Sequence, residues 1–268
     1  MREITSKDNK IFRHALSLKT KKYRDRYGEY LIEGPNLLKE ALKEEIEVEA
    51  VFVRPEMTDE EASIIEEGPG LDRKTFVLSG RLFDELKDTE TSQGIITVVK
   101  KQEVSFKGPP GGNWVVLDRL QDPGNIGTIL RTADAAGFEM AVFMKGTADP
   151  YGPKVVRSAT GSLFRLPIVY AENADELAEL VHSMGKRLIA TAMDAVKAYY
   201  ECDLSEDAAI IIGNEGNGIS PELIAGADEK ISIPMAGNTE SLNAAVAAGI
   251  LMYERIRRQN ERSVTANP

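Results

Sequence analysis

Three short stretches of this 268-residue chain combine polar side chains with glycine or proline at spacings that could build a ligand site. The first reads L-D-R-L-Q-D-P-G-N-I-G-T-I-L-R-T-A over Leu117–Ala133. Asp122 and Pro123 are ordinary residues for the start of a helix, so capping explains part of the pattern. Capping does not explain Asn125 and Arg131, an amide and a guanidinium that stand about 1.7 helical turns apart. Both could project into a cleft, although an arginine on an amphipathic helix usually faces solvent.

The second stretch, I-I-I-G-N-E-G-N-G-I-S-P-E over Ile210–Glu222, is a buried-strand pattern that runs into a glycine-rich turn. Glycine permits a positive φ and lets a ligand approach the backbone closely. The turn has neither the Lys-Ser/Thr pair of a phosphate-binding loop nor the G-x-G-x-x-G spacing of a dinucleotide fold, which excludes a nicotinamide oxidoreductase. Glu215 in this turn is a candidate for chemistry, but a glutamate there is more often a cap or an ion-pair partner.

The third stretch, I-S-I-P-M-A-G-N-T-E-S-L-N-A-A-V-A-A-G-I over Ile231–Ile250, joins a strand to a long helix. We expect the strand to end at Pro234 and the helix to begin near Ser241. Apolar and small residues then recur on one face of the helix, which predicts close packing against a neighbouring element. Ser241 and Asn243 fall in its first turn, where serine and asparagine also serve as ordinary caps.

The elements around these stretches predict where the loops lie. From residue 114 onward strands alternate with helices, which predicts a parallel sheet covered on both faces. Each stretch follows or contains the end of a predicted strand, and open α/β sheets bind ligands beyond the carboxyl ends of their strands. The expected strands are Trp114–Leu117, Met140–Met144, Arg187–Ala192, Ala209–Ile212 and Lys230–Ile233, and the expected helices are Pro123–Ala136, Asn173–Met184, a short one after Ser220, and Glu240–Arg258.

A smaller α/β pattern precedes this series and predicts a second domain. Its expected helices are Pro35–Glu45, Asp59–Glu67 and Arg81–Leu86, and its expected strands are Glu49–Val53, Thr75–Leu78 and Gly94–Val99. The stretch KQEVSFKGPPGG over 101–112 then breaks the pattern with prolines and glycines, as a linker does. We therefore expect an N-terminal domain over residues 1–100 and a C-terminal domain over residues 113–268.

The charge distribution sets the N-terminal residues apart. The net charge of −10 argues at first against a nucleic-acid partner, but screening limits the reach of a charge to about 8 to 10 Å at cellular salt. Residues 1–26 carry nine Lys/Arg against three acids, a local excess of +6. Such a strip is either a solvated helix face or a contact for RNA phosphates. The candidates for RNA contacts are Arg13, Lys19, Lys21, Lys22 and Arg24.

The rest of the composition excludes several classes of protein. With 42% hydrophobic and 28% charged residues the chain is globular, and no apolar run approaches the roughly 18 residues of a membrane span. The N-terminal residues lack the apolar core of a signal peptide, so we expect a cytoplasmic location. Cys202 is the only cysteine, and His14 and His182 are the only histidines, so we expect neither a disulfide nor a Cys/His metal site.

Together, the three stretches resemble the motifs of the SpoU (TrmH-like) family of RNA 2′-O-ribose methyltransferases, within the SPOUT superfamily. The blocks P-G-N-I-G…R-T-A and I-P-M-x-G…E-S-L-N carry the resemblance, which covers about 145 residues from Trp114 to Arg258. It implies an α/β trefoil-knot domain, S-adenosyl-L-methionine as the cofactor, and a homodimer. The first 100 residues are similar to the RNA substrate-binding extension of many members, which has a ribosomal-protein-like fold. Members with this extension tend to act on 23S ribosomal RNA.

The resemblance also implies roles for individual residues. An adenine ring needs a dry slot and backbone groups that read its edge, and the residues that match the cofactor loops suit this need. The cofactor-binding candidates are Gly213, Ile233 and Leu242, with Thr191 and Met235 as weaker ones. The polar positions of the motifs are matched by Asn125, Arg131, Glu215, Ser241 and Asn243, which are the catalytic candidates.

Arg131 matches the essential arginine of the family. A ribose hydroxyl is a poor nucleophile, so the site must hold oxygen, methyl carbon and sulfur in line, which can lower the barrier by roughly 7–11 kcal/mol. A guanidinium is a poor general base because its pKa lies above about 12. We therefore expect Arg131 to orient the RNA phosphate and to stabilise developing negative charge. A contribution as general base stays open.

Three alternatives stay open as well. The target could be transfer RNA, on which shorter members of the family act. The chain could be a non-catalytic RNA-binding protein with a knot fold, although the joint presence of the five polar motif residues argues against this. It could also use S-adenosyl-L-methionine on a base or a small molecule, and the basic N-terminal strip argues against a small substrate.

Overall fold

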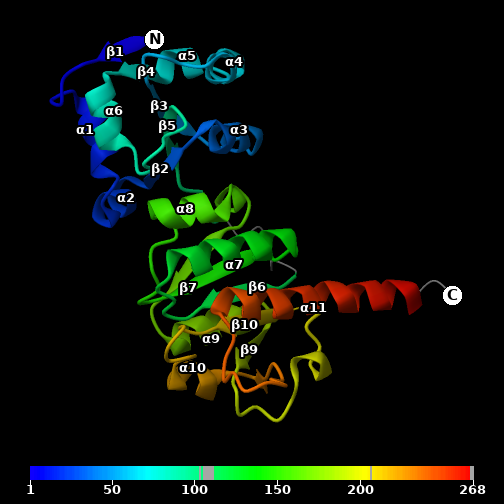
Figure 1. The fold of residues 1–268 in the computed structure, drawn as a ribbon. Coiled ribbons are helices and arrows are strands. Elements are labelled where there is room, and N and C mark those ends of the chain that lie inside the picture. The colour runs from blue at the N-terminus through cyan, green and yellow to red at the C-terminus, as the bar shows by residue number, and fades with distance from the viewer. Residues whose placement is uncertain (103, 105–111, 206, 266–268) are drawn as a thin grey trace. The chain divides into compact units, whose positions relative to one another are not determined.

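The computed structural model describes residues 1–102, 104, 112–205 and 207–265, which form two compact units (Figure 1). Unit 1 comprises residues 1–103 and 149–164, and unit 2 comprises residues 104–148 and 165–268. The boundaries expected from the sequence assigned residues 149–164 to the C-terminal domain, whereas this segment packs with the N-terminal residues. Of the expected linker 101–112, residues 103 and 105–111 lie outside the described residues.

Unit 1 is built on a five-stranded mixed sheet in the order β1-β4-β3-β5-β2. Strand β5 is antiparallel to β2 and β3, and the other neighbours are parallel. Phe12 of α1 and Leu82 of α6 share one buried cluster with Phe52 and Phe76 of the sheet, so α1 and α6 cover one face, and α3 lies on the other (Figure 1). The elements of unit 1 are β1 (Arg2–Ile4), α1 (Lys10–Ser17), α2 (Lys21–Tyr27), β2 (Glu29–Glu33), α3 (Pro35–Lys43), β3 (Val48–Val53), α4 (Asp59–Glu67), α5 (Leu71–Lys74), β4 (Thr75–Leu78), α6 (Gly80–Leu86), β5 (Ile95–Lys100), α8 (Pro153–Ala159) and η1 (Ser162–Phe164).

The segment 149–164 is joined to the rest of unit 1 by a buried ion pair and an aromatic contact. Nε and Nη2 of Arg24 donate to the Asp149 carboxylate at 2.9 and 2.6 Å, and the two side chains are only 6% and 10% exposed. The rings of Tyr30 and Tyr151 lie 4.8 Å apart. Arg24 was expected to contact RNA. Its burial in this ion pair makes it a packing residue instead, and we no longer assign it an RNA contact.

Unit 2 is built on a six-stranded sheet in the order β11-β9-β10-β6-β7-β8, and every neighbouring pair of strands is parallel. Helices α7 and α11 cover one face and α9 and α10 cover the other (Figure 1). Because both faces are covered, strands β6, β7 and β10 are buried and apolar along their whole length. A parallel α/β domain preceded by a smaller α/β domain is the fold class expected from the sequence, and it is confirmed. The elements of unit 2 are β6 (Trp114–Leu117), α7 (Pro123–Ala135), β7 (Met140–Met144), β8 (Ile168–Ala171), α9 (Ala174–Ser183), β9 (Arg187–Thr191), η2 (Tyr199–Glu201), β10 (Ala208–Ile212), α10 (Pro221–Gly226), β11 (Glu229–Ile231) and α11 (Ala244–Thr265).

The connection between β11 and α11 doubles back across the sheet. Strand β11 is the edge strand beyond β9, while α11 packs against α7 and contacts β10. The loop between β9 and β10 contacts the chain both just after β11 and within α11. Ala198 forms a β-bridge with Ser232, and the carbonyl of Tyr200 accepts a hydrogen bond from Arg258. This path agrees with the trefoil knot that the family resemblance implies.

The start of α11 differs from the expectation. The helix begins at Ala244 instead of Glu240, and Asn243 caps it, because its Oδ1 accepts two backbone N–H groups of the first turn at 2.9 and 3.3 Å. Ser241 therefore lies in the connecting segment and not in the helix. Within the described ranges, no helix has the length and apolarity that crossing a membrane requires.

Candidate active site

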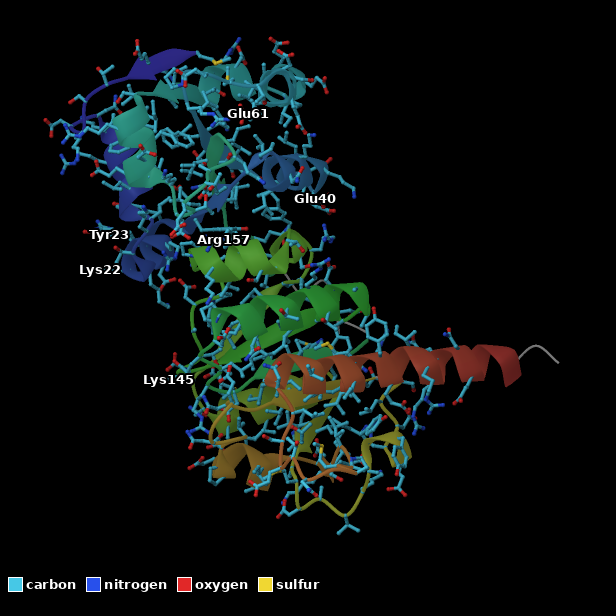
Figure 2. All side chains as sticks on the ribbon, viewed as in Figure 1. Lys22, Tyr23, Glu40, Glu61, Lys145 and Arg157 are labelled. Carbon is cyan, nitrogen blue, oxygen red and sulfur yellow. The ribbon has the colours of Figure 1, made fainter. Side chains whose placement is uncertain are left out.

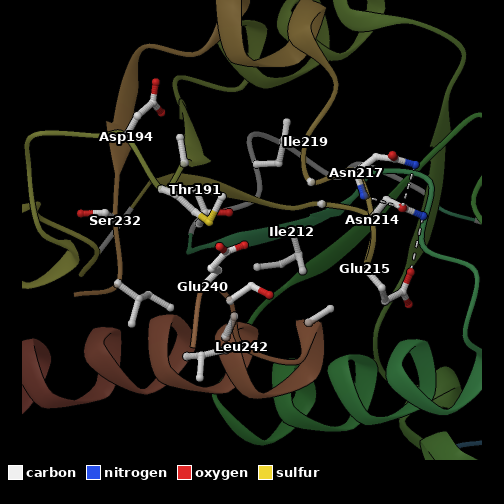
Figure 3. Close-up of a pocket in the computed structure, with 18 of the residues that line it drawn as sticks. Thr191, Asp194, Ile212, Asn214, Glu215, Asn217, Ile219, Ser232, Glu240 and Leu242 are labelled. Atoms are coloured by element: carbon white, nitrogen blue, oxygen red, sulfur yellow. Dashed lines mark hydrogen bonds between the residues drawn. The ribbon is translucent and has the colours of Figure 1, made fainter. Parts of the chain in front are cut away.

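A cavity of about 550 Å³ opens at the carboxyl ends of β9, β10 and β11 (Figure 3). This is the edge of a parallel sheet at which ligands bind. The glycine-rich loop after β10 forms one wall, and the segment that leads into α11 forms another. All five residues expected to bind the cofactor line the cavity, together with two of the expected catalytic residues: Thr191, Gly213, Ile233, Met235 and Leu242, then Glu215 and Ser241.

The shape of the glycine-rich wall depends on Gly213. The backbone groups of Asn214 and Gly218 bond to each other in both directions, at 3.0 and 2.9 Å, so the loop folds back on itself. A Cβ atom at Gly213 would lie 2.4 Å from the carbonyl carbon of Gly218 and 2.4 Å from the backbone nitrogen of Ile219. Because such contacts are far inside van der Waals distance, a residue with a Cβ cannot occupy position 213 unless the backbone moves.

Three of the expected catalytic side chains form one hydrogen-bonded row. Nδ2 of Asn243 donates to Oδ1 of Asn125 at 3.0 Å, and Nδ2 of Asn125 donates to Oε1 of Glu215 at 3.1 Å. The backbone N–H groups of Gln121 and Asp122 also donate to the Glu215 carboxylate, at 3.4 and 3.3 Å. The row joins the start of α7, the glycine-rich loop and the start of α11, so it links the three sequence motifs in space.

The hydrogen bonds around Glu215 keep its carboxylate charged. Partial burial raises the pKa of Glu215, but the bonds donated by Asn125 and by the backbone N–H groups of Gln121 and Asp122 outweigh it, and the pKa lies below its ordinary value of 4.5. A general base at neutral pH works best with a pKa near the working pH. Glu215 is therefore suited to orienting Asn125 and not to removing a proton.

Arg131 lies apart from this row. It is an exposed residue of α7, and it is not among the residues that line the cavity. In the part of the chain that the structure describes, its guanidinium makes no hydrogen bond and no ion pair. One copy of the chain thus brings Asn125, Glu215 and Asn243 together and leaves Arg131 free to bind an anion.

Asp118, a buried residue that connects the loops of the site, was not among the site residues predicted from the sequence. It follows β6, and its carboxylate accepts a hydrogen bond from the backbone N–H of Ser220 at 2.7 Å. Arg119 comes next with a φ of 56°, a left-handed conformation that costs a non-glycine residue roughly 1–2 kcal/mol. The Arg119 carbonyl accepts a hydrogen bond from Nδ2 of Asn214 at 2.8 Å, which ties this turn to the glycine-rich loop. An aspartate at the carboxyl end of a buried strand was the signal that could have found it.

The composition of the cavity fits S-adenosyl-L-methionine. Ile212, Ile233 and Leu242 give an apolar lining for an adenine ring. The acidic residues Asp194 and Glu240 line the same cavity (Figure 3) and would attract the positive sulfonium and ammonium groups. These two acids were not predicted from the sequence. Among the residues that the structure describes, no group of three or more His, Cys, Asp or Glu side chains could hold a metal ion.

The remaining RNA-contact candidates on α1 and α2 differ in what their cations already bind. Lys19 donates to two backbone carbonyls of unit 1, at 2.8 and 2.9 Å, and Lys21 pairs with a carboxylate at 2.6 Å. Arg13 and Lys22 are exposed, and neither pairs with a carboxylate of the described residues. Figure 2 shows Lys22 on the surface of α2. Arg13 and Lys22 are therefore the most available of these cations.

Comparison with known proteins identifies relatives of both units. Residues 112–253 match the model of the SpoU rRNA Methylase family, and residues 9–97 match the MRM3-like substrate binding domain. The chain is 37% identical to the 23S rRNA (guanosine(2553)-2′-O)-methyltransferase of Bacillus subtilis, over 94% of this chain and 98% of that protein.

Solved structures are similar over nearly the same length. The SpoU methyltransferase AviRb from Streptomyces viridochromogenes, in complex with the cofactor AdoMet, is 30% identical with a TM-score of 0.83, over 94% of this chain and 98% of that chain. The AdoMet-bound rRNA methyltransferase from Sinorhizobium meliloti is 30% identical with a TM-score of 0.82, over 96% and 98%. The similarity thus extends over both units.

Proposed function

This chain belongs to the SpoU rRNA methylase family, and we propose that it transfers the methyl group of S-adenosyl-L-methionine to a ribose 2′-hydroxyl of 23S ribosomal RNA. The observation that carries the proposal is the row Asn243–Asn125–Glu215 at the rim of a cavity that suits this cofactor. The match of residues 9–97 to a substrate-binding domain supports a large RNA as substrate.

The chain contributes position and hydrogen bonds to the reaction, and the cofactor supplies an activated methyl group on a sulfonium. Asn125 uses one N–H on Glu215 and one lone pair on Asn243. A side-chain amide has two N–H donors and two acceptor lone pairs, so Asn125 keeps one of each for a ribose hydroxyl. Ser241 adds a hydroxyl at the cavity wall. Holding the hydroxyl in line with the methyl group is the largest contribution that these residues can make.

Arg131 supplies positive charge for the RNA. Its guanidinium stays protonated at any working pH, and it has no partner among the described residues. It therefore binds the phosphate next to the reacting ribose and stabilises the negative charge that develops on the oxygen. We expect Arg131→Ala to lower the rate of methyl transfer by about 100- to 1,000-fold. The affinity for S-adenosyl-L-methionine should not change, because Arg131 does not line the cavity.

In this proposal the two units have different functions. Unit 1 binds the RNA, with Arg13 and Lys22 as contacts, and unit 2 binds the cofactor and carries out the transfer. We propose a cytoplasmic location, which fits the bacterial 23S rRNA methyltransferase that the chain resembles.

The active form in this proposal is a homodimer. Val246 and Tyr253 are 51% and 52% exposed on α11, and their spacing of two helical turns puts two large apolar side chains on one face. A second copy that covers this face would bring its own α7, with Arg131, close to the site. Sedimentation at micromolar concentration should give a dimer, and Val246→Asp with Tyr253→Asp should give a monomer of unchanged melting temperature. A monomeric wild type would contradict the homodimer.

The test of the proposed function is methylation of total RNA with radiolabelled S-adenosyl-L-methionine, followed by nuclease mapping of the label. We expect the label on a ribose of 23S ribosomal RNA. Label on transfer RNA would leave the chemistry intact and change the substrate, whereas label on a base would overturn the chemistry. Failure of the purified protein to bind the cofactor would overturn the assignment as an enzyme.

A further inference from the structure

A second recess lies in unit 1, and none of the residues used in the proposed reaction lines it. It has a volume of about 380 Å³, which lies within the usual range for small-molecule sites. Its floor is apolar and comes from three neighbouring strands, with Ala50 on β3, Phe76 on β4 and Val98 on β5. These strands belong to the sheet face that carries α1, and Ile11 of that helix adds to the apolar lining.

Cations surround this floor. Arg2 of β1, Lys10 of α1, and Arg73 and Lys74 of α5 all line the recess. Nζ of Lys74 donates a hydrogen bond to the carbonyl of Val48 at 2.5 Å. Lys10 and Arg73 are exposed, and their side-chain cations make no hydrogen bond or ion pair with any described residue. On a chain with a net charge of −10, two unpaired cations beside one apolar recess point to an anionic ligand.

Arg2 gives the recess a flat stacking surface. Its guanidinium carbon lies 4.8 Å from the centre of the Phe76 ring, and Nη2 donates to the carbonyl of Arg73 at 3.2 Å. The guanidinium is thus held over the floor of the recess. Unpaired RNA bases stack on arginine planes and on aromatic rings in proteins that bind single-stranded RNA.

Two carboxylates in the recess differ in what they bind. Glu29 is buried and accepts hydrogen bonds from Lys100 at 2.8 Å and from His14 at 2.5 Å. Glu49 is 35% exposed, and its nearest cation, Lys100, is 3.8 Å away. Glu29 is therefore satisfied within the protein, while Glu49 keeps acceptor capacity for a ligand. Carboxylates accept hydrogen bonds from the amino groups of bases.

We propose that this recess binds one unpaired nucleotide of the RNA substrate, with the phosphates on Lys10 and Arg73, the base against Arg2, and an amino group of the base on Glu49. This inference rests on RNA being the substrate. It adds a residue-level site in unit 1, and it predicts a preference for a base that has an exocyclic amino group. Cytosine has one and uracil does not, so these two pyrimidines test the role of Glu49 without a change in size.

The experiment measures binding of fluorescein-labelled C8 and U8 RNA to the full-length chain by fluorescence anisotropy over a range of salt. Lys10→Ser with Arg73→Ser should weaken both by roughly tenfold and reduce the slope of log affinity against log salt by about 1.4. Lys39→Ser with Lys43→Ser is the matched control, because it removes two exposed cations from α3 on the other face of the sheet. Its effect should stay below about twofold.

The base preference gives the second readout. The wild type should bind C8 about fivefold more tightly than U8, and Glu49→Gln should remove most of that difference. Arg2→Lys keeps the charge and loses the stacking plane, so it should weaken both probes without changing the salt slope. All substituted side chains are exposed or partly exposed, and an unchanged melting temperature will verify that each variant is folded.

The outcomes separate this proposal from the proposed function. Equal binding of C8 and U8 by wild type and Glu49→Gln, or a loss in the α3 control as large as in the recess variant, would overturn the nucleotide site. Wild type that methylates ribosomal RNA, with a Lys10→Ser/Arg73→Ser variant of unchanged KM, would also overturn it and leave the enzyme assignment standing. If C8 and U8 bind as expected but the protein transfers no methyl group, the nucleotide site stands and the enzyme assignment is overturned.

Discussion

The hydrogen bonds that the Glu215 carboxylate accepts determine its role. The carboxylate accepts hydrogen bonds from the side-chain amides of Asn125 and Asn214 and from two backbone N–H groups, and Asn125 is the catalytic candidate among these donors. Hydrogen bonds from a neutral amide to a charged acceptor contribute about 1.5–3 kcal/mol. If this energy orients Asn125 toward the ribose, its loss should appear in the rate of transfer and not in the binding of the cofactor.

Glu215→Gln tests this orientation. We expect kcat for methyl transfer to fall by about 10- to 100-fold, because the amide cannot accept all the hydrogen bonds that the carboxylate accepts. The matched control is Glu222→Gln, which neutralises an exposed glutamate of α10 outside the cavity and should leave kcat unchanged. Equal rate constants for methyl transfer in wild type and Glu215→Gln, measured under single-turnover conditions, would remove Glu215 from the site.

The lowered pKa of Glu215 gives a pH prediction. A carboxyl whose folded-state pKa is depressed below its ordinary 4.5 contributes stability at higher pH and loses it only as the pH falls through the depressed value. Between pH 6 and pH 9, the single-turnover rate should therefore show no titration that depends on Glu215. An acidic limb above pH 6 that is present in the wild type and absent in Glu215→Gln would show that Glu215 acts as a base.

Single residues also mark what the sequence could and could not predict. The cofactor candidates were taken from the family resemblance, and all of them line one cavity, which lies at the strand ends where ligand loops are expected. The RNA-contact prediction, in contrast, rested on the number of cations in residues 1–26 and could not distinguish one cation from another. The structure shows that Arg24 is buried, whereas Arg13 and Lys22 are exposed. The partner of Arg24 is 125 residues away in the chain. Local composition contains no information on a pairing over that distance.

At the scale of elements, loop geometry controls the cavity, and position 213 is its tightest point. Gly213→Ala would place a Cβ against the backbone of Gly218 and Ile219. Overpacking of this kind costs about 1–3 kcal/mol, and the loop that bears the strain is a wall of the cofactor cavity. We expect S-adenosyl-L-methionine affinity to fall by roughly 10-fold or more in calorimetric titration. Gly226→Ala is the control, since a Cβ there meets nothing within 4 Å; equal affinities of the two variants would contradict the argument.

Two helices show how a cap sets the point at which a predicted helix begins. Helix α4 was expected at Asp59–Glu67 and has these bounds, because Thr58 and Glu61 form a capping box there. Helix α11 was expected to start at Glu240, with the possible capping residues Ser241 and Asn243 in its first turn. The helix begins at Ala244 instead, because Asn243 caps it and also donates a hydrogen bond to Asn125. A tertiary contact, the hydrogen bond from Asn243 to Asn125, therefore favours Asn243 over Ser241 as the cap.

At the scale of the whole molecule, the chain is not divided where its sequence pattern changes. Helix α8 gave no recognisable signal, being short and flanked by glycines at 152 and 161. Its segment nevertheless belongs to unit 1, through Asp149 and Tyr151. The N-terminal unit therefore depends on residues that follow β7 of the catalytic unit, and no cut between residues 100 and 113 can separate two complete domains.

A fragment of residues 1–102 should therefore be much less stable than the same fragment carrying 149–164. Without the segment, the fragment loses the Arg24–Asp149 ion pair and the Tyr30–Tyr151 contact. With the segment present, Asp149→Ala would leave the buried Arg24 guanidinium without its carboxylate, and loss of one partner of a buried ion pair costs about 3–5 kcal/mol. Joining is feasible because Gln102 donates to the carbonyl of Phe164 at 2.7 Å and Lys101 lies 4.5 Å from the Tyr151 ring. A glycine–serine linker from residue 102 to residue 149 should raise the urea midpoint, and Asp149→Ala in that fusion should reverse most of the gain. Equal midpoints for all three proteins would mean that unit 1 folds without the segment.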